Sequence, residues 1–135
     1  MKLLLDTHVA MWSIAGYELL DKKIYEMIMN PDNDIYYSTV TPWEIEIKHL
    51  KRPDKIKISG EQFADLCEQA RFINLNIKNE HISELKNIVS KDKKQKHNDP
   101  FDKMLLAQAR YENLVLVTHD KKFKLYNDSD HMLVF

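Results

Sequence analysis

The stretch Leu114-Val115-Leu116-Val117-Thr118 decides the fold of this chain, because it is apolar without interruption up to its last residue. A half-buried strand alternates apolar and polar side chains, whereas a continuous apolar run indicates burial on both faces, as in a parallel sheet covered by helices. The segment Lys2-Leu3-Leu4-Leu5 is predicted to be a second short buried strand, which ends at Asp6.

Outside these two strands, patterns typical of helices alternate with patterns typical of strands. Further strands are expected at residues 35–38, 72–75 and 132–135. Helices are expected at residues 9–14, 21–29, 41–50, 59–69, 79–89 and 99–112. In the helix over 79–89, Ile82, Leu85, Ile88 and Val89 are expected to share one face. The alternation predicts a single domain over residues 1–135, a three-layer α/β/α domain with a central, mostly parallel sheet.

Composition limits the classes of protein to which the chain can belong. A length of 135 residues suits one domain, and 44% hydrophobic with 30% charged residues is a globular balance. The apolar runs are too short to span a bilayer, and Asp6 interrupts the apolar start, so a cytoplasmic protein without membrane contact is expected. Two glycines and one cysteine, Cys67, exclude a Gly-rich phosphate loop, an internal disulfide and a thiolate metal site.

Charge is nearly balanced overall but unevenly distributed. The formal net charge of −1 does not by itself point to nucleic acid. The first of two basic clusters contains Lys48, Lys51, Arg52, Lys55 and Lys57, and the second contains Lys91, Lys93, Lys94 and Lys96. Each cluster is either a solvated face or a rim that contacts phosphates.

Four acidic residues stand at comparable ends of the predicted elements. Asp6 follows the first strand and Asp120 follows the strand that ends at Thr118, while Glu44 and Asp102 lie in early turns of helices. Ligands of an open α/β sheet collect beyond the carboxyl ends of its strands, so the four carboxylates are expected to converge if both helices start at that edge. Carboxylates held together repel one another, and a divalent cation relieves the repulsion. Oxygen ligands favour Mg²⁺ or Mn²⁺, which suits phosphodiester hydrolysis by water.

Each acid also has an ordinary structural interpretation. The two acids at strand ends are typical turn residues. Glu44 fits a capping box with Thr41. Asp99 fits a helix N-cap, and Asp102 would stabilise the same helix end through the helix dipole. Spacing alone leaves both the metal site and these structural roles open.

Hydroxyl and basic side chains stand beside the acids. Thr7, Ser38 and Thr118 occupy positions from which hydroxyls can support ligating carboxylates, although turn and capping roles explain them equally well. His97, which follows the second basic cluster, and Lys48 in the first are candidates for contact with substrate phosphate or, equally, solvated surface residues.

Four blocks of the sequence together resemble the successive motifs of PIN domains. They are Leu3-Leu4-Leu5-Asp6-Thr7-His8, Ser38-Thr39-Val40-Thr41-Pro42-Trp43-Glu44-Ile45-Glu46-Ile47-Lys48, His97-Asn98-Asp99-Pro100-Phe101-Asp102-Lys103-Met104-Leu105-Leu106-Ala107-Gln108-Ala109 and Leu116-Val117-Thr118-His119-Asp120. The similarity is greatest to the VapC-like toxin branch, whose sequences carry an H-x-D-P-F-D segment. Asn98 stands where that branch usually has a basic residue, so one phosphate contact lacks its usual side chain.

The resemblance implies a compact α/β/α fold and an Mg²⁺- or Mn²⁺-dependent endoribonuclease that leaves a 5′-phosphate and a 3′-hydroxyl. It implies that Asp6, Glu44, Asp102 and Asp120 form the acidic quartet, and that Asp99 either approaches the metal or only caps its helix. It also implies the toxin of a type II toxin–antitoxin system. Such a toxin forms a homodimer and is blocked by a small antitoxin protein whose tail occupies the active-site groove.

Two other functions remain open on the sequence alone. A haloacid-dehalogenase-like phosphatase also uses Mg²⁺ and places its nucleophilic aspartate after the first strand, but it needs a second aspartate two positions later, where His8 stands. A non-catalytic PIN-like module would bind RNA or a partner protein without cutting, and the retained acids weigh against it.

Overall fold

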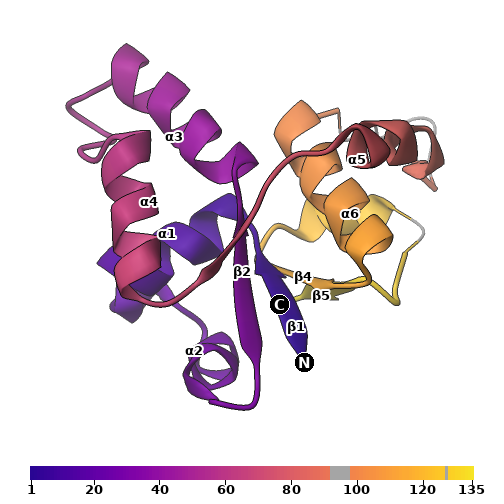
Figure 1. Ribbon diagram of the computed structural model, residues 1–135, viewed down its shortest axis with the longest axis horizontal. Coiled ribbons are helices and arrows are strands. Elements are labelled where there is room, and N and C mark those ends of the chain that lie inside the picture. The colour runs from indigo at the N-terminus through magenta and orange to yellow at the C-terminus, as the bar shows by residue number, and fades with distance from the viewer. Residues whose placement is uncertain (92–97, 127) are drawn as a thin grey trace.

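Five parallel strands form the centre of the structure, in the order β3-β2-β1-β4-β5 (Figure 1). This computed structural model describes residues 1–91, 98–126 and 128–135. Among these residues the elements follow one another as β1 (Lys2–Leu5), α1 (Thr7–Ala15), η1 (Tyr17–Leu19), α2 (Lys22–Met29), β2 (Asp34–Ser38), α3 (Val40–Lys51), α4 (Gly60–Gln69), β3 (Ile73–Leu75), α5 (Asn79–Glu84), η2 (Leu85–Asn87), α6 (Pro100–Glu112), β4 (Val115–Thr118), η3 (Lys121–Leu125) and β5 (Met132–Val134), where η marks a 3₁₀ helix.

The first strand lies in the middle of the sheet and pairs with a strand on each side. Leu3 of β1 stands opposite Ile35 of β2 and also opposite Val115 of β4. The chain runs outward from β1 through β2 to β3, then returns to the other side of β1 for β4 and β5. The strand order therefore reverses between β1 and β4, which is the place where open α/β sheets bind their ligands.

The central strand is buried on both faces, as its apolar run predicted. Successive strand side chains point to opposite faces. Leu3 and Leu5 accordingly pack in a core cluster with residues of α1 to α4, whereas Leu4 packs in a second cluster with residues of α6 and η3. In Figure 1, α1 to α4 lie on one side of the sheet, and α5 and α6 on the other. The predicted three-layer α/β/α fold is confirmed.

One predicted helix differs from the structure. The segment expected to be helical over residues 79–89 forms only the short helix α5, followed by the 3₁₀ helix η2. Ile82 and Val89, expected on a buried face, are 52% and 63% exposed. His81 is instead 0% exposed and points into the interior, which turns its neighbour Ile82 toward solvent. No helix of the described residues is long and apolar enough to cross a membrane.

The close packing of α4 against α3 generates a test at Gly60. A Cβ atom at this residue would lie 2.3 Å from the backbone oxygen of Pro42. We therefore expect Gly60→Ala to lower the free energy of unfolding by about 1–3 kcal/mol, the usual cost of overpacking, as measured by urea unfolding. Gly16→Ala is the matched control, because the nearest atom to its Cβ lies at an ordinary 3.5 Å. Equal stability of the two variants would contradict the close approach.

Candidate active site

Asp6 lies where β1 ends and α1 begins. Its backbone N–H donates to the carbonyl of Val117 at 3.1 Å, which extends the sheet by one residue. Its Oδ1 accepts the N–H of Val9 at 2.9 Å as the N-cap of α1, and its Oδ2 accepts the hydroxyl of Thr118. Burial raises the pKa of this carboxyl, although both hydrogen bonds oppose the increase. The carboxylate is therefore held rigidly at the carboxyl edge of the sheet.

Thr118 connects the ends of the two strands that flank the reversal of strand order. Its side chain is buried at the end of β4. The hydroxyl donates to Asp6 and accepts the backbone N–H of Asp120 at 2.9 Å. Asp120 in turn caps the 3₁₀ helix η3 by accepting the N–H of Lys122 at 2.9 Å. The hydroxyl of Thr118 thus fixes the backbone of Asp120 relative to the carboxylate of Asp6.

Glu44 projects from α3 and is buried, with both carboxylate oxygens engaged. Its Oε1 accepts the hydroxyl of Thr7 at 2.8 Å, and its Oε2 pairs with the ammonium of Lys48 at 2.6 Å. The capping box expected with Thr41 is wrong, because α3 begins earlier, at Val40, so that Thr41 already lies inside the helix. The hydrogen bond from Thr7 connects the start of α1 to α3.

Two further acids lie at the start of α6. Asp99 is the N-cap of this helix, since its Oδ1 accepts the N–H of Phe101 at 2.8 Å and that of Asp102 at 3.1 Å. The N-cap interpretation of Asp99 is therefore confirmed. Asp102 lies in the first turn, half-buried, on the side of the sheet opposite α1 and α4.

The electrostatics of Asp102 show that five acids share one region of the molecule. Burial, followed by repulsion from Asp99, Glu44, Asp6 and Asp120, raises the pKa of Asp102 to about 8. These four acids belong to four different elements: Asp6 follows β1, Asp120 follows β4, Glu44 lies in α3, and Asp99 directly precedes α6. The structure therefore brings together all the acids singled out in the sequence.

By their chemistry the five acids fit a hard divalent cation. Carboxylates in mutual repulsion are the ligands that Mg²⁺ and Mn²⁺ prefer. Among the described residues, however, no three His, Cys, Asp or Glu side chains gather their donor atoms as a bound ion requires. The oxygens of Asp6 and Glu44 face hydroxyl and ammonium groups instead. Binding an ion therefore requires some of the acids to turn, and Glu44 to release the ammonium of Lys48.

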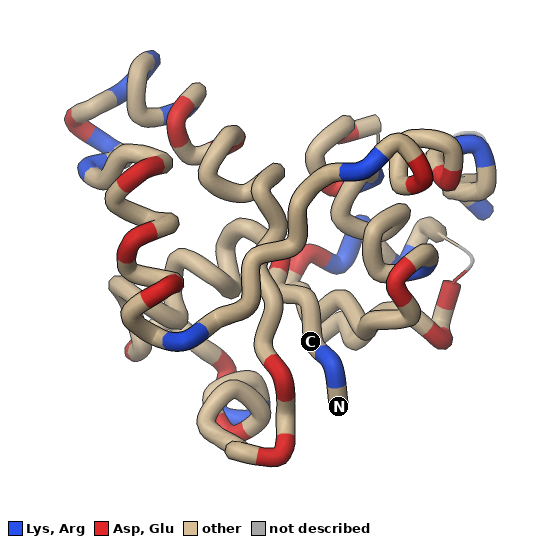
Figure 2. Tube along the Cα trace, in the orientation of Figure 1, with Lys and Arg blue, Asp and Glu red and all other residues tan. Residues whose placement is uncertain are grey.

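Other residues singled out in the sequence have different surroundings. Ser38 is fully buried at the end of β2, and its hydroxyl bonds to Gln108 and to the N–H of Val40 rather than to an acid. Lys48 contacts Glu44, as described above. His97, together with Lys93, Lys94 and Lys96 of the second basic cluster, lies outside the described residues. Figure 2 shows the first basic cluster at the far end of α3 and in the connection to α4.

Two features beside the acids were missed in the sequence. Trp43 and Phe101 each precede an acid, and their rings meet edge to face with centroids 4.9 Å apart, leaving Trp43 55% exposed. Gln108 is fully buried on the apolar side of α6. Its signal was a lone amide within an otherwise apolar run, Leu105-Leu106-Ala107-Gln108-Ala109.

Comparisons with known proteins agree with this fold. The PIN domain family model matches residues 3–128 of the chain. Fifteen chains of solved structures match, among them one in the crystal structure of VapBC2 from Rickettsia felis bound to a DNA fragment from their promoter. That match has a TM-score of 0.72 and 17% sequence identity, and covers 100% of this chain and 99% of the other. At this identity it shows the fold alone. No curated protein matches the chain.

The pKa of Asp102 predicts a pH-dependent stability in the absence of metal. Because burial and repulsion raise this pKa from 3.8 to about 8, the folded protein binds the proton more tightly than the unfolded chain does. The stabilising contribution is complete below pH of about 4 and is lost as the pH rises to about 8. In chelator at pH 8, Asp102→Asn is therefore expected to raise the thermal unfolding midpoint by about 4 °C or more, roughly 1 kcal/mol for a domain of this size.

The same comparison at lower pH provides the control. Near pH 4 the carboxyl of Asp102 is neutral, as is the amide that replaces it, so the two proteins should unfold at similar temperatures. An effect of Asp102→Asn that is equal at both pH values would show that the charge of Asp102 does not destabilise the folded protein.

Proposed function

The chain belongs to the PIN domain family, and on this premise we propose that it is an endoribonuclease that hydrolyses RNA phosphodiester bonds with the help of Mg²⁺ or Mn²⁺. PIN domains are generally nucleases. The observation that carries the proposal is the convergence on Asp102 of the charges of four other acids, at the carboxyl edge of a parallel sheet. Such a concentration of like charge is costly to a folded protein unless a cation relieves it.

In the proposed mechanism, the acids hold the cation and the neighbouring hydroxyls hold the acids. The residues that bind the ion are Asp6, Glu44, Asp102 and Asp120, with Asp99 either approaching it or only capping α6. When bound, the cation acidifies a water nucleophile and offsets the charge that develops on phosphorus. Thr7 and Thr118 keep Glu44 and Asp6 oriented through their hydrogen bonds. Asp102, whose raised pKa favours the neutral carboxyl, would have to lose its proton to serve as a ligand, because metal ligands must be ionised.

Lys48 has two successive partners in this proposal. Without metal, its ammonium neutralises the carboxylate of Glu44 at 2.6 Å. The side chain of Lys48 is 46% exposed, so it can leave this ion pair toward solvent. If Glu44 held a cation instead, the ammonium of Lys48 would be available for a phosphate oxygen of the RNA. The rest of the first basic cluster, at the end of α3 and in the connection to α4, then guides the RNA backbone toward the acids.

We further propose that the chain is the toxin of a type II toxin–antitoxin pair, cytoplasmic and homodimeric, and inhibited by a small antitoxin protein. The full-length match to a chain of the VapBC2 structure supports this assignment. The motif that carries the branch resemblance, Asp99-Pro100-Phe101-Asp102, also begins α6 and so lies within the acidic site. An antitoxin segment that covers this helix end would block the RNA from the acids.

A non-catalytic binding module is the second candidate function. The ion pair between Lys48 and Glu44 favours it, since the resting site has one acid already neutralised without metal. The family match weighs against the third candidate, a haloacid-dehalogenase-like phosphatase.

Asp6→Asn tests the metal-dependent chemistry. The amide retains an oxygen to accept the N–H of Val9 and so preserves the cap of α1, but it removes a charge from the acidic site. We expect cleavage of a panel of structured RNAs in Mg²⁺ to fall at least about 100-fold, the upper effect of losing a residue that only supports a metal ligand, and wild-type cleavage to cease in chelator. Gel-based cleavage rates measure both effects.

The matched control is Asp21→Asn. Asp21 is also a helix N-cap, of α2, and accepts the N–H of Lys23 at 2.7 Å. Its variant should cut RNA as the wild type does. Cleavage by Asp6→Asn at the wild-type rate would refute the site, and RNA binding without any cleavage by the wild type would favour the binding module.

The first basic cluster predicts a salt-dependent interaction with RNA. Each phosphate contact of a single strand contributes about 0.7 to the slope of log affinity against log salt. Replacing Lys51, Lys55 and Lys57 by glutamine should therefore weaken binding and lower this slope by about 2, as measured by fluorescence anisotropy with the inactive Asp6→Asn background.

Three exposed lysines elsewhere provide the control for charge. Lys2, Lys22 and Lys23 belong to β1 and α2, at the opposite end of the sheet from the acids (Figure 1). Their replacement by glutamine should leave the slope unchanged. Equal slopes for both triple variants would exclude a specific role of the first basic cluster.

A further inference from the structure

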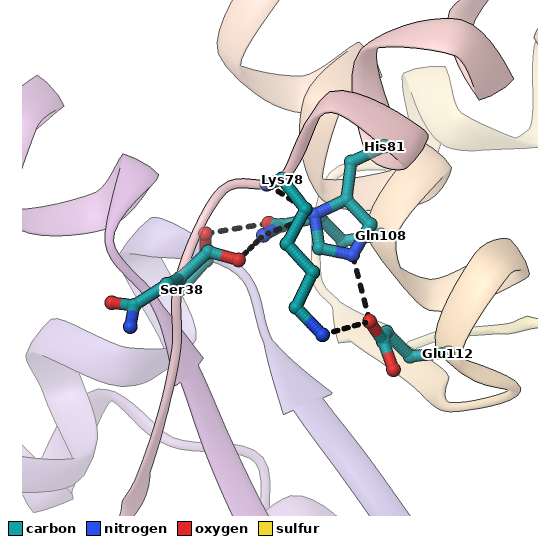
Figure 3. A network of polar contacts seen from close by, with 6 residues as sticks. Ser38, Lys78, His81, Gln108 and Glu112 are labelled. Atoms are coloured by element: carbon teal, nitrogen blue, oxygen red, sulfur yellow. Dashed lines mark hydrogen bonds and ion pairs between the residues drawn. The ribbon is translucent and has the colours of Figure 1, made fainter.

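A chain of polar contacts crosses the interior from the end of β2 to the end of α6 (Figure 3). Ser38, Gln108 and His81 are each 0% exposed. Burying a polar group costs free energy unless it is hydrogen-bonded, and an apolar side chain of similar shape avoids that cost. Stability alone therefore does not explain why three polar side chains in contact with one another are buried here.

The hydroxyl of Ser38 and the amide of Gln108 each have one defined role. The Oγ of Ser38 accepts the N–H of Val40 at 3.0 Å and donates its own proton to Oε1 of Gln108 at 2.5 Å. The Nε2 of Gln108 donates to the carbonyl of Asn76 at 3.4 Å and lies at the same distance from Nδ1 of His81, whose one lone pair accepts the N–H of Lys78. Contacts at both its oxygen and its nitrogen therefore fix the orientation of the Gln108 amide.

His81 ends the chain on a carboxylate. Its Nδ1 accepts the backbone N–H of Lys78 at 3.0 Å, so Nε2 carries the proton and donates it to Oε1 of Glu112 at 2.9 Å. The same oxygen pairs with the ammonium of Lys78 at 3.3 Å. The bond from His81 is the main cause that lowers the pKa of Glu112, which keeps this acceptor charged. Every donor faces an acceptor, so the network has a single arrangement and locks the side chain of Gln108.

This network connects the two helices that carry the acids. Ser38 is the last residue of β2, and its Oγ accepts the N–H of Val40, the first residue of α3, while Gln108 lies six residues after Asp102 on α6. Six residues of helix span about 9 Å, over which a helix is stiff. A displacement of Gln108 along α6 therefore displaces Asp102 by the same amount. The edge-to-face contact of Trp43 with Phe101 is a second junction between the same helices.

We propose that Ser38 and Gln108 are positioning residues of the acidic site, whose hydrogen bond holds α3 and α6 at the separation needed to bind the divalent cation. This inference rests on the proposed function. Glu44 lies on α3 and Asp102 on α6, so the distance between these two acids depends on how the two helices are held relative to each other. The buried bond fixes that relative position, so the backbone is arranged for the ion in advance and only side chains need to turn.

The test measures Mn²⁺ affinity of the folded, RNA-free protein by isothermal titration calorimetry. Ser38→Ala and Gln108→Leu each remove the bond, and each is expected to raise the Kd for Mn²⁺ about tenfold, the lower effect of losing a residue that supports a metal ligand. Because both residues act through the same bond, the double variant should lose no more affinity than either single variant. The KM for RNA should stay unchanged while kcat falls, since neither side chain contacts RNA.

Ser13→Ala is the matched control. Ser13 is 3% exposed, and its hydroxyl donates to the carbonyl of Val9 at 2.6 Å within α1, joining no acid-bearing helices. Ser13→Ala and Ser38→Ala each remove one buried hydrogen bond, so both should lower the thermal stability by a similar amount. Ser13→Ala should nevertheless leave the Kd for Mn²⁺ within about twofold of wild type. If Gln108→Leu fails to fold, the Kd for Mn²⁺ of Ser38→Ala, compared with that of Ser13→Ala, still tests the positioning role.

The possible failures are distinguishable. Wild-type Mn²⁺ binding with unchanged affinity in Ser38→Ala overturns the positioning role and leaves the proposed function intact. An additive loss in the double variant overturns the role of the shared bond. A wild-type protein that binds no Mn²⁺ overturns both the metal site and this inference.

Discussion

The parallel direction of all five strands is the constraint on which the rest of the structure depends. Parallel strands place their carboxyl ends at one edge, and the connections that follow them begin there as well. Asp6, Glu44 and Asp120 follow three of these strand ends, while Asp99 and Asp102 enter the same region from the start of α6. The fold therefore concentrates acidic side chains in one place, where burial, followed by repulsion from the other acids, raises the pKa of Asp102.

The protein partly compensates this cost without metal, using neutral donors and one cation. Hydroxyls of Thr7 and Thr118 and the N–H groups of helix starts donate to the acids, and Lys48 neutralises Glu44. None of these partners supplies the doubly charged centre that four or five carboxylates favour. The arrangement without metal is thus ordered and incompletely neutralised, as our proposal of a cation site requires.

The sequence predicted the elements whose signal is local and failed where a tertiary contact changed the signal. Unbroken apolar runs at Leu3 to Leu5 and at Leu114 to Val117 indicated strands buried on both faces, and the order of elements indicated the layers. The helix over 79–89 failed because buried His81 defines the inward face, which hydrophobic periodicity does not count. The capping box of Thr41 with Glu44 failed because α3 begins at Val40, so that Thr41 lies inside the helix, and the carboxylate of Glu44 instead binds Thr7, 37 residues away in the chain.

The sequence by itself determined which residue types stand at which element ends, because helix caps, strand ends and apolar runs depend on neighbours along the chain. It therefore sufficed to name the five acids and the oxygen-only chemistry that they offer. Only the tertiary structure decided that these acids lie close enough to repel one another, that Thr118 joins Asp6 to Asp120, and that Ser38 meets Gln108. These contacts join segments up to 112 residues apart, and the physical reason is that the strand order sets such distances, whereas local sequence preference does not.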